Sequence, residues 1–233
     1  MSFTALSPAL PAAATLAAYV AAERLYVRTR WAVLHPVLVA VVALIGFLRV
    51  TGLPYGAYAE GTRPISVWLG PAVVALGVNL HDQRAGIARL GRRLYLALFV
   101  GSAVGIVTAA GIARALGGSP RVVASLAPKS VTTPIAMAIT ERAGGIPPLT
   151  AVVVITVGVL GAAVGPAWLR LVGVRAPTAW GLAMGAGAHG VGTARALEQG
   201  PAEGAASALA IGLNGLATAV LTPPALALLR MLG

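Results

Sequence analysis

The stretch Pro128-Lys-Ser-Val-Thr-Thr-Pro-Ile-Ala136 interrupts a long apolar sequence with two prolines, three hydroxyl side chains and the only lysine of the chain. Apolar residues flank it on both sides. A break in the backbone at membrane depth is tolerated only where protein buries it or where it lines a polar cavity. An ionisable residue at such a place indicates a functional site. The stretch therefore predicts a membrane protein with an anion-binding site at a broken helix.

The composition supports a membrane location. The 233 residues are 58% hydrophobic and only 10% charged, whereas soluble domains carry about 25% charged residues. The net charge is +11, but the arginines lie in short loops between apolar stretches. The positive-inside rule explains that pattern, so nucleic acid is not an expected partner. The absence of cysteine excludes disulfides and thiolate metal sites. The first apolar stretch lacks a preceding basic region, so no cleavable signal is expected.

Several apolar stretches predict membrane segments. Those long enough to cross about 30 Å of hydrocarbon lie at 5–22, 33–50, 94–113, 149–169 and 205–230, and a shorter one lies at 67–80. Two crossings separate the basic clusters at 24–30 and 84–93, so both clusters can lie on the cytoplasmic side. The N-terminus and the loop 51–66 are then outside. The stretch 81–93 is predicted to form a short interfacial helix.

Two further segments, 118–144 and 174–200, are apolar but broken by glycine, proline and polar residues. A shift of 57 residues lays 94–141 over 151–198 and aligns Pro120 with Pro177. The match indicates either a repeat or chance similarity in a chain rich in alanine, glycine and valine. Paired interrupted segments are typical of transporter sites. We therefore expect an all-α, multi-pass fold of about six to eight membrane segments. We expect residues 1–233 to form one transmembrane domain, with scaffold-like helices in 1–93 and, if the match reflects a repeat, a repeat pair with broken helices in 94–233.

The path of the two broken segments stays open. If each is a re-entrant hairpin, Arg170 and Arg175 lie in the cytoplasm and the two repeats have inverted topology. If each segment crosses the membrane, these arginines lie outside. The positive-inside rule favours the hairpins.

Polar groups gather at both breaks. In the first, Thr133 and Pro134 predict a helix N-cap followed by proline at the first helical position. The free N–H groups of that helix end favour an anion. Candidate carboxylate ligands around the two breaks are Lys129, Ser130, Thr132, Thr133, His189, Thr193 and Arg195. Alternatively, the hydroxyls only cap helices, the lysine only reaches an interface, and the histidine and glycines only pack in a core.

Four more polar residues are weaker candidates. Glu141 and Glu198 end the broken segments and are either solvated helix ends or ion-coupling groups. Asn79 and Asn214 lie in apolar segments, where an amide either bonds a neighbouring helix or contacts a substrate. The three histidines lack metal-ligand spacing, and no Ser–His–carboxylate arrangement is present. Neither a metal site nor an enzyme is therefore predicted.

Five stretches of this chain resemble the LrgB/CidB family of bacterial membrane proteins, in the family's order and over about residues 15–230. They are Leu69-Gly-Pro-Ala-Val-Val-Ala-Leu76, Pro128-Lys-Ser-Val-Thr-Thr-Pro-Ile-Ala-Met-Ala138, Gly144-Gly-Ile-Pro147, Gly181-Leu-Ala-Met-Gly185 and His189-Gly-Val-Gly-Thr-Ala-Arg-Ala196. The chain departs from the family at Asn79, where relatives commonly have proline.

The resemblance implies two functions. Bacterial members are antiholin-like or holin-like modulators of murein hydrolase export and autolysis, and usually work beside a small LrgA/CidA-type membrane protein. Others, with the plastid glycolate/glycerate translocator, are implicated in moving small monocarboxylates such as glycolate, glycerate or pyruvate.

From the breaks and the resemblance, we expect a monocarboxylate transporter in the bacterial cytoplasmic membrane that works by alternating access. No cofactor is expected. His189 is the candidate for proton coupling, with sodium as the other coupling ion. A homodimer is expected by analogy with transporters that need a fixed scaffold. The alternative function is that of a regulator of murein hydrolase export, and a third is a passive pore formed with a smaller subunit.

Overall fold

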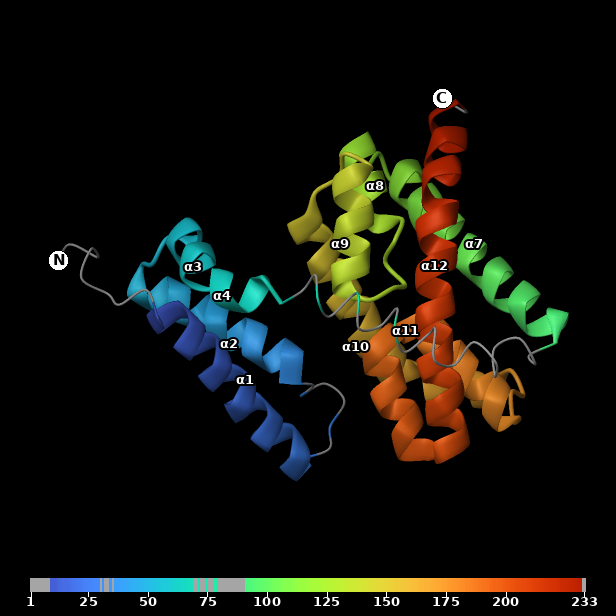
Figure 1. Ribbon diagram of the computed structural model, residues 1–233, viewed down its shortest axis with the longest axis horizontal. Helices are drawn as coiled ribbons and strands as arrows, with labels where there is room; N and C mark the ends of the chain where they lie inside the picture. Colours follow the sequence, from blue (N-terminus) through green and yellow to red (C-terminus); the bar gives the residue numbers. More distant parts are fainter. Residues whose placement is uncertain are drawn as a thin grey trace. The chain divides into compact units, whose positions relative to one another are not determined.

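The computed structural model describes residues 9–29, 31, 34, 36–68, 71, 74, 78 and 91–231. Regular structure within these ranges is helical throughout, which confirms the all-α prediction (Figure 1). The chain forms two compact units, Met1–Ala72 and Val73–Gly233. The prediction of one transmembrane domain with an internal division after residue 93 stays a prediction.

The first unit consists of α1 (Ala9–Thr29), α2 (Pro36–Thr51), α3 (Tyr55–Gly61) and α4 (Arg63–Ser66). α1 packs against α2 and α3, and a hydrogen bond of 2.8 Å joins Thr15 Oγ1 to the Tyr58 hydroxyl. The predicted crossing at 5–22 corresponds to α1, which runs on into a charged last third. The predicted crossing at 33–50 corresponds to α2, an apolar helix of 16 residues. Most of the predicted segment 67–80 lies outside the described residues.

The second unit holds the broken segments. Its helices are α7 (Arg92–Ala115), α8 (Pro120–Leu126), α9 (Thr133–Arg142), α10 (Pro147–Leu171), α11 (Pro177–Gln199) and α12 (Pro201–Met231). α12 packs along α11 and also contacts α7 and α9, while α10 contacts α8, α9 and α11. Among the described residues, three helical stretches are long and apolar enough to cross a membrane, at 92–115, 147–171 and 201–229. They contain the predicted segments 94–113 and 149–169, and all of the predicted segment 205–230 except its last residue.

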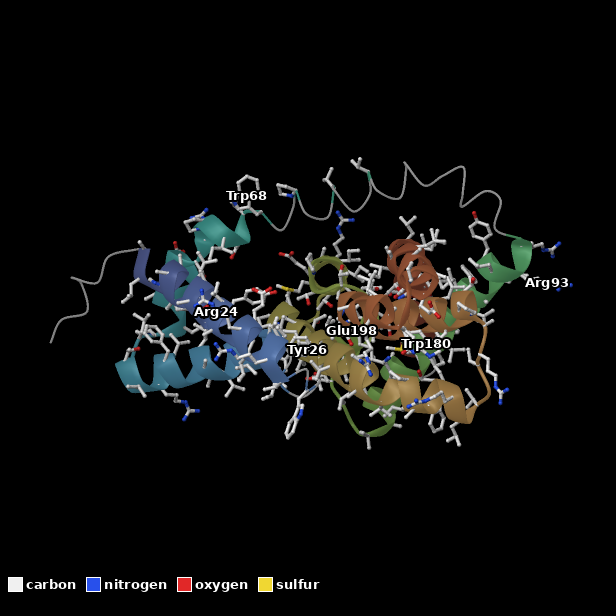
Figure 2. The ribbon with its side chains drawn as sticks, turned by 90° about the horizontal axis from the view of Figure 1, so that it is seen from below. Arg24, Tyr26, Trp68, Arg93, Trp180 and Glu198 are labelled. Carbon is white, nitrogen blue, oxygen red and sulfur yellow. The ribbon has the colours of Figure 1, made fainter. Side chains whose placement is uncertain are left out.

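Residues 81–90 of the predicted interfacial helix lie outside the described residues. The last two residues of that prediction, Arg92 and Arg93, begin α7. Figure 2 shows the Arg93 side chain projecting outward from this end of the helix.

The first broken segment doubles back between α8 and α9. Ser125, near the end of α8, accepts a hydrogen bond of 2.7 Å from the Ile146 N–H, which lies just beyond α9. Thr150 Oγ1 donates to the Ser125 carbonyl at 2.9 Å and also lies 2.9 Å from Thr140 Oγ1. Ser125, Thr140 and Thr150 are fully buried. These bonds hold the two arms together, so the intervening chain forms a turn.

The second broken segment also folds back on itself, within α11. Trp180, Met184 and Ala196 belong to one hydrophobic cluster, although a straight helix would place residues 180 and 196 about 24 Å apart. Gly185 faces Ser207 of α12, and Thr193 forms a hydrogen bond to the same serine. Since residues on both sides of the break reach one residue of α12, the two arms of α11 lie side by side.

Candidate functional site

The turn of the first broken segment carries the lysine. The Lys129 ammonium donates to the hydroxyl of Ser130 at 3.0 Å. The lysine is half-buried, and it forms no ion pair with a carboxylate of any described residue. The Ser130 hydroxyl faces α7 at Gly105, where an added Cβ would lie 3.4 Å from it. The turn therefore presents a cation that has no counter-ion among the described residues.

The N-terminus of α9 differs by one residue from the prediction. The N-cap is Thr132, which has extended backbone angles, and the predicted cap, Thr133, is the first helical residue. The Thr132 side chain makes no capping hydrogen bond. A cap normally accepts from the second or third helical N–H, and here the second position is Pro134, which has no N–H. The Thr132 hydroxyl is therefore not engaged in capping α9.

The break in α11 lies at Ala188 and His189. The backbone of His189 has φ +43° and ψ −131°, a conformation that non-glycine residues rarely adopt. The side chain is 6% exposed, and its Nε2 lies 2.9 Å from the Val154 carbonyl oxygen of α10. That contact is a hydrogen bond only when Nε2 carries the proton, because a carbonyl can only accept. Gly158 makes room for the ring, since a Cβ there would lie 2.6 Å from Cε1.

Asn214 of α12 joins the two breaks. Its Nδ2 donates to the Ser130 carbonyl of the first turn at 2.8 Å and to the Ala186 carbonyl just before the second break at 3.1 Å. Its Oδ1 accepts a hydrogen bond from Ser102 of α7. The residue is 1% exposed. One buried amide therefore holds main-chain groups of both broken segments, with all of its hydrogen-bonding groups engaged.

The remaining predicted residues have other partners. Thr193 Oγ1 donates to the His189 carbonyl at 3.0 Å and lies 2.7 Å from the Ser207 hydroxyl. Arg195 forms an ion pair of 2.5 Å with Glu198, three residues further along the same helix. The Arg195 side chain is 42% exposed, and Glu141 is also exposed. Asn79 lies outside the described residues.

The structure thus joins the turn of Lys129 and Ser130 to the second break through Asn214, whereas Arg195 is paired with Glu198. Sequence reasoning missed the buried polar face of α12. Four fully or almost fully buried polar residues lie on it, at helical spacings of seven, four and four: Ser207, Asn214, Thr218 and Thr222. That spacing is the periodicity of one helix face and could have revealed it.

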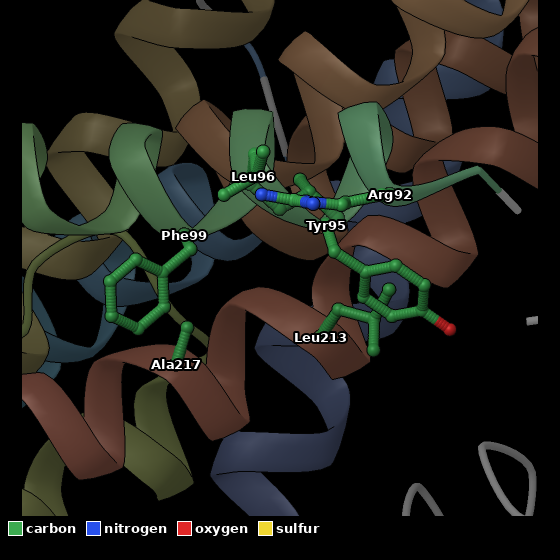
Figure 3. A pocket seen from close by; sticks show the side chains of 7 residues that line it. Arg92, Tyr95, Leu96, Phe99, Leu213 and Ala217 are labelled. Carbon is green, nitrogen blue, oxygen red and sulfur yellow. The ribbon is translucent and has the colours of Figure 1, made fainter.

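Two hollows lie beside these elements. One, of about 530 Å³, lies between the start of α7 and the middle of α12, where Tyr95 and Phe99 face Leu213 and Ala217 (Figure 3). The other, of about 500 Å³, runs between α9 and α12 from Pro134 to Arg142. Neither is lined by Lys129, His189 or Asn214. Among the described residues, no group of three or more histidine, aspartate or glutamate side chains could hold a metal ion.

Long apolar helices together with two polar breaks define an all-helical membrane protein. The LrgB-like family model matches residues 15–228, so the chain belongs to the LrgB-like family.

Relatives match along most of their length. The antiholin-like protein LrgB of Bacillus mycoides is 35% identical over 188 residues, which cover 81% of this chain and 82% of the relative. The uncharacterized protein YwbG of Bacillus subtilis is 34% identical over 209 residues, covering 90% and 93%. An uncharacterized protein of Haemophilus influenzae is 33% identical over 201 residues, covering 85% and 87%. No solved structure matches.

Proposed function

We propose that this chain is an antiholin-like protein of the bacterial cytoplasmic membrane. It would cross the membrane several times and regulate murein hydrolase export with a small LrgA/CidA-type partner. The observation that carries this role is the similarity to relatives named antiholin-like protein LrgB over four fifths of both chains. Their names support regulation more directly than any feature of this chain supports transport.

A second candidate function is the passage of small monocarboxylates such as glycolate, glycerate, pyruvate or lactate. One observation favours it: the half-buried ammonium of Lys129 has no carboxylate partner among the described residues and lies at one of two joined breaks. A carboxylate could accept charge-assisted hydrogen bonds from Lys129 and from the hydroxyls of Ser130, Thr132 and Thr133. Alternating access is the expected mechanism, because paired broken segments are typical of carriers.

In this second function the other break supplies the remaining groups. Thr193 would contact the substrate near Ser207, and His189 would exchange a proton if transport is coupled to protons. Arg195 could take part only by leaving Glu198, which holds it at 2.5 Å. We therefore place Arg195 in an outer role, as a group that attracts the anion before it reaches Lys129.

The arrangement of the broken segments suits either function. Both fold back on themselves, as re-entrant hairpins do, and their bounds recur at the predicted shift of 57 residues. Pro120 and Pro177 begin α8 and α11, and Arg142 and Gln199 end α9 and α11. We propose that these segments belong to the predicted inverted repeat, in which 94–141 matches 151–198, with α12 outside it.

One experiment separates the two functions. Bacteria lacking their own LrgB-type gene are complemented with the wild type, Lys129→Gln or Arg63→Gln. The last removes an exposed charge whose ion pair to Glu60 is loose, at 4.0 Å. Murein hydrolase activity in the culture medium and uptake of labelled glycolate, glycerate, pyruvate and lactate into liposomes are then measured. The small partner is present in both assays.

The regulatory function predicts that wild type and Arg63→Gln change hydrolase release equally. It is wrong if the wild type leaves release unchanged. The carrier function predicts saturable uptake that Lys129→Gln abolishes and Arg63→Gln retains. Uptake that is absent, or undiminished in Lys129→Gln, contradicts it.

A further inference from the structure

We propose that Asn214 is the positioning residue that couples the two broken segments, so that one break cannot rearrange without the other. The inference depends on neither function above, since it concerns how the breaks communicate. The two N–H groups of the Asn214 side-chain amide donate hydrogen bonds to one carbonyl in each broken segment, that of Ser130 and that of Ala186.

The need for such a donor follows from the breaks themselves. Where a helix stops, its last carbonyl groups lose their partners within the helix. In a membrane interior, water cannot replace those partners, so each unpaired group destabilises the fold. Ser130 lies in the turn between α8 and α9, and Ala186 lies two residues before the first non-helical residue of α11. Asn214 satisfies one carbonyl at each place.

The coupling follows from geometry. Both carbonyl oxygens lie within 3.1 Å of a single nitrogen atom. A shift of either segment by more than a few tenths of an ångström lengthens its own bond or pulls the amide away from the other. The Ser102 hydroxyl of α7 fixes the opposite edge of the amide. Rotation of the amide to follow one segment would therefore break the contacts to α7 and to the other segment.

A substitution at Gly158 can disturb the second break, because Gly158 lies against the His189 ring. A Cβ on Gly158 would lie 2.6 and 2.7 Å from Cε1 and Nε2 of His189. The substitution Gly158→Ala therefore displaces the ring. Gly101 of α7, which lies 57 residues earlier, has open space where its Cβ would be. Gly101→Ala is thus a matched control with the same change on a helix surface.

Because the chain contains no cysteine, single cysteines can report on each break. Ala127 in the first turn is 1% exposed and Ala188 at the second break is 2% exposed. Ala127→Cys and Ala188→Cys should react slowly with a maleimide in the folded, detergent-solubilised chain. Their reaction rates then measure the local opening of each break.

We expect Gly158→Ala to raise the reaction rate at both reporters, by about tenfold at Ala188→Cys, which corresponds to about 1.4 kcal/mol of local opening. Gly101→Ala should leave both rates unchanged. Asn214→Ala should raise both rates. When it is combined with Gly158→Ala, the rate at Ala188→Cys rises further but the rate at Ala127→Cys does not.

Three further variants keep the test decisive. Asn214→Asp retains the size of the side chain but cannot donate to both carbonyls, whether its carboxyl is charged or protonated, and it replaces Asn214→Ala if that variant misfolds. Ser102→Ala removes the α7 contact and keeps both donors. Thr222→Val alters the same buried face of α12 at a residue bonded to Thr218 of its own helix. In the Ser102→Ala and Thr222→Val backgrounds, Gly158→Ala should still raise the reaction rate at Ala127→Cys.

Coupling through Asn214 is wrong if Gly158→Ala leaves the rate at Ala127→Cys unchanged. It is also wrong if that effect survives in both Asn214→Ala and Asn214→Asp, because transmission would then pass directly through α10. Since no substrate or partner protein enters the assay, failure here says nothing against either function proposed above.

Discussion

At the scale of single residues, His189 is the one non-glycine residue with a positive φ among the residues that the structure describes. A non-glycine residue in such a sparsely populated region costs about 1–3 kcal/mol. Glycine would remove that cost at once. The retained histidine ring and its bond to the Val154 carbonyl therefore offset a backbone penalty.

This strain gives a prediction for two substitutions that both remove the ring. His189→Ala keeps the penalty, whereas His189→Gly relieves it. We expect the glycine variant to be the more stable of the two by about 1 kcal/mol. Thermal unfolding of both in the same detergent measures the difference. Equal stabilities would show that the backbone relaxes when the ring is absent.

The same scale shows what sequence reasoning could and could not reach. The positions of Lys129 and His189 at breaks follow from glycine and proline, which mark where helical hydrogen bonding ends. Their hydrogen-bond partners do not follow from the sequence, because a side-chain amide such as that of Asn214 can donate to any neighbouring carbonyl. The pair of Arg195 and Glu198 has the spacing of neighbours on a helix. That signal was available and argues against assigning Arg195 to a site deep in the protein.

At the scale of elements, the arms of the first broken segment are held together by buried hydroxyls. Thr150 bonds the Ser125 carbonyl and contacts Thr140, so Thr150→Val leaves buried groups unpaired. A loss of about 1–3 kcal/mol of stability is expected. The control is Thr156→Val, at an exposed residue of the same helix that bonds only the Val152 carbonyl of its own helix.

Thr156→Val should change the unfolding temperature little, since exposed substitutions usually lie within about 0.5 kcal/mol. Equal losses in the two variants would mean that the hydroxyl network does not hold α8 to α10.

Apolar length alone predicted α7, α10 and α12. The positive-inside rule favours hairpins for the broken segments but does not fix their path, since a break shows where a helix ends but not where the chain goes next.

At the scale of the whole molecule, the open question is which ends of the broken segments share a side of the membrane. With the start of α7 in the cytoplasm, re-entrant hairpins place residues 116 and 141 outside and residue 171 inside. If the segments cross instead, residue 116 stays outside, residue 141 moves inside and residue 171 moves outside.

Single cysteines decide this, because the chain has none of its own. Leu116 and Leu171 are 82% and 77% exposed, and Glu141 is exposed as well. In intact cells, a membrane-impermeant maleimide should label Leu116→Cys and Glu141→Cys but not Leu171→Cys. Labelling of Leu171→Cys with protection of Glu141→Cys would rule out the hairpins.

The amide of Asn214 is followed by Gly215, and an asparagine before glycine is the pair most prone to spontaneous deamidation. That reaction needs the next backbone nitrogen to reach the side-chain carbonyl, which a helical backbone and three engaged hydrogen bonds oppose. Loosening of α12 would remove that protection, and the resulting aspartate could no longer donate to both breaks. The fraction of chains that carry aspartate or isoaspartate at this position would therefore increase with the time that α12 has spent open since the protein was made.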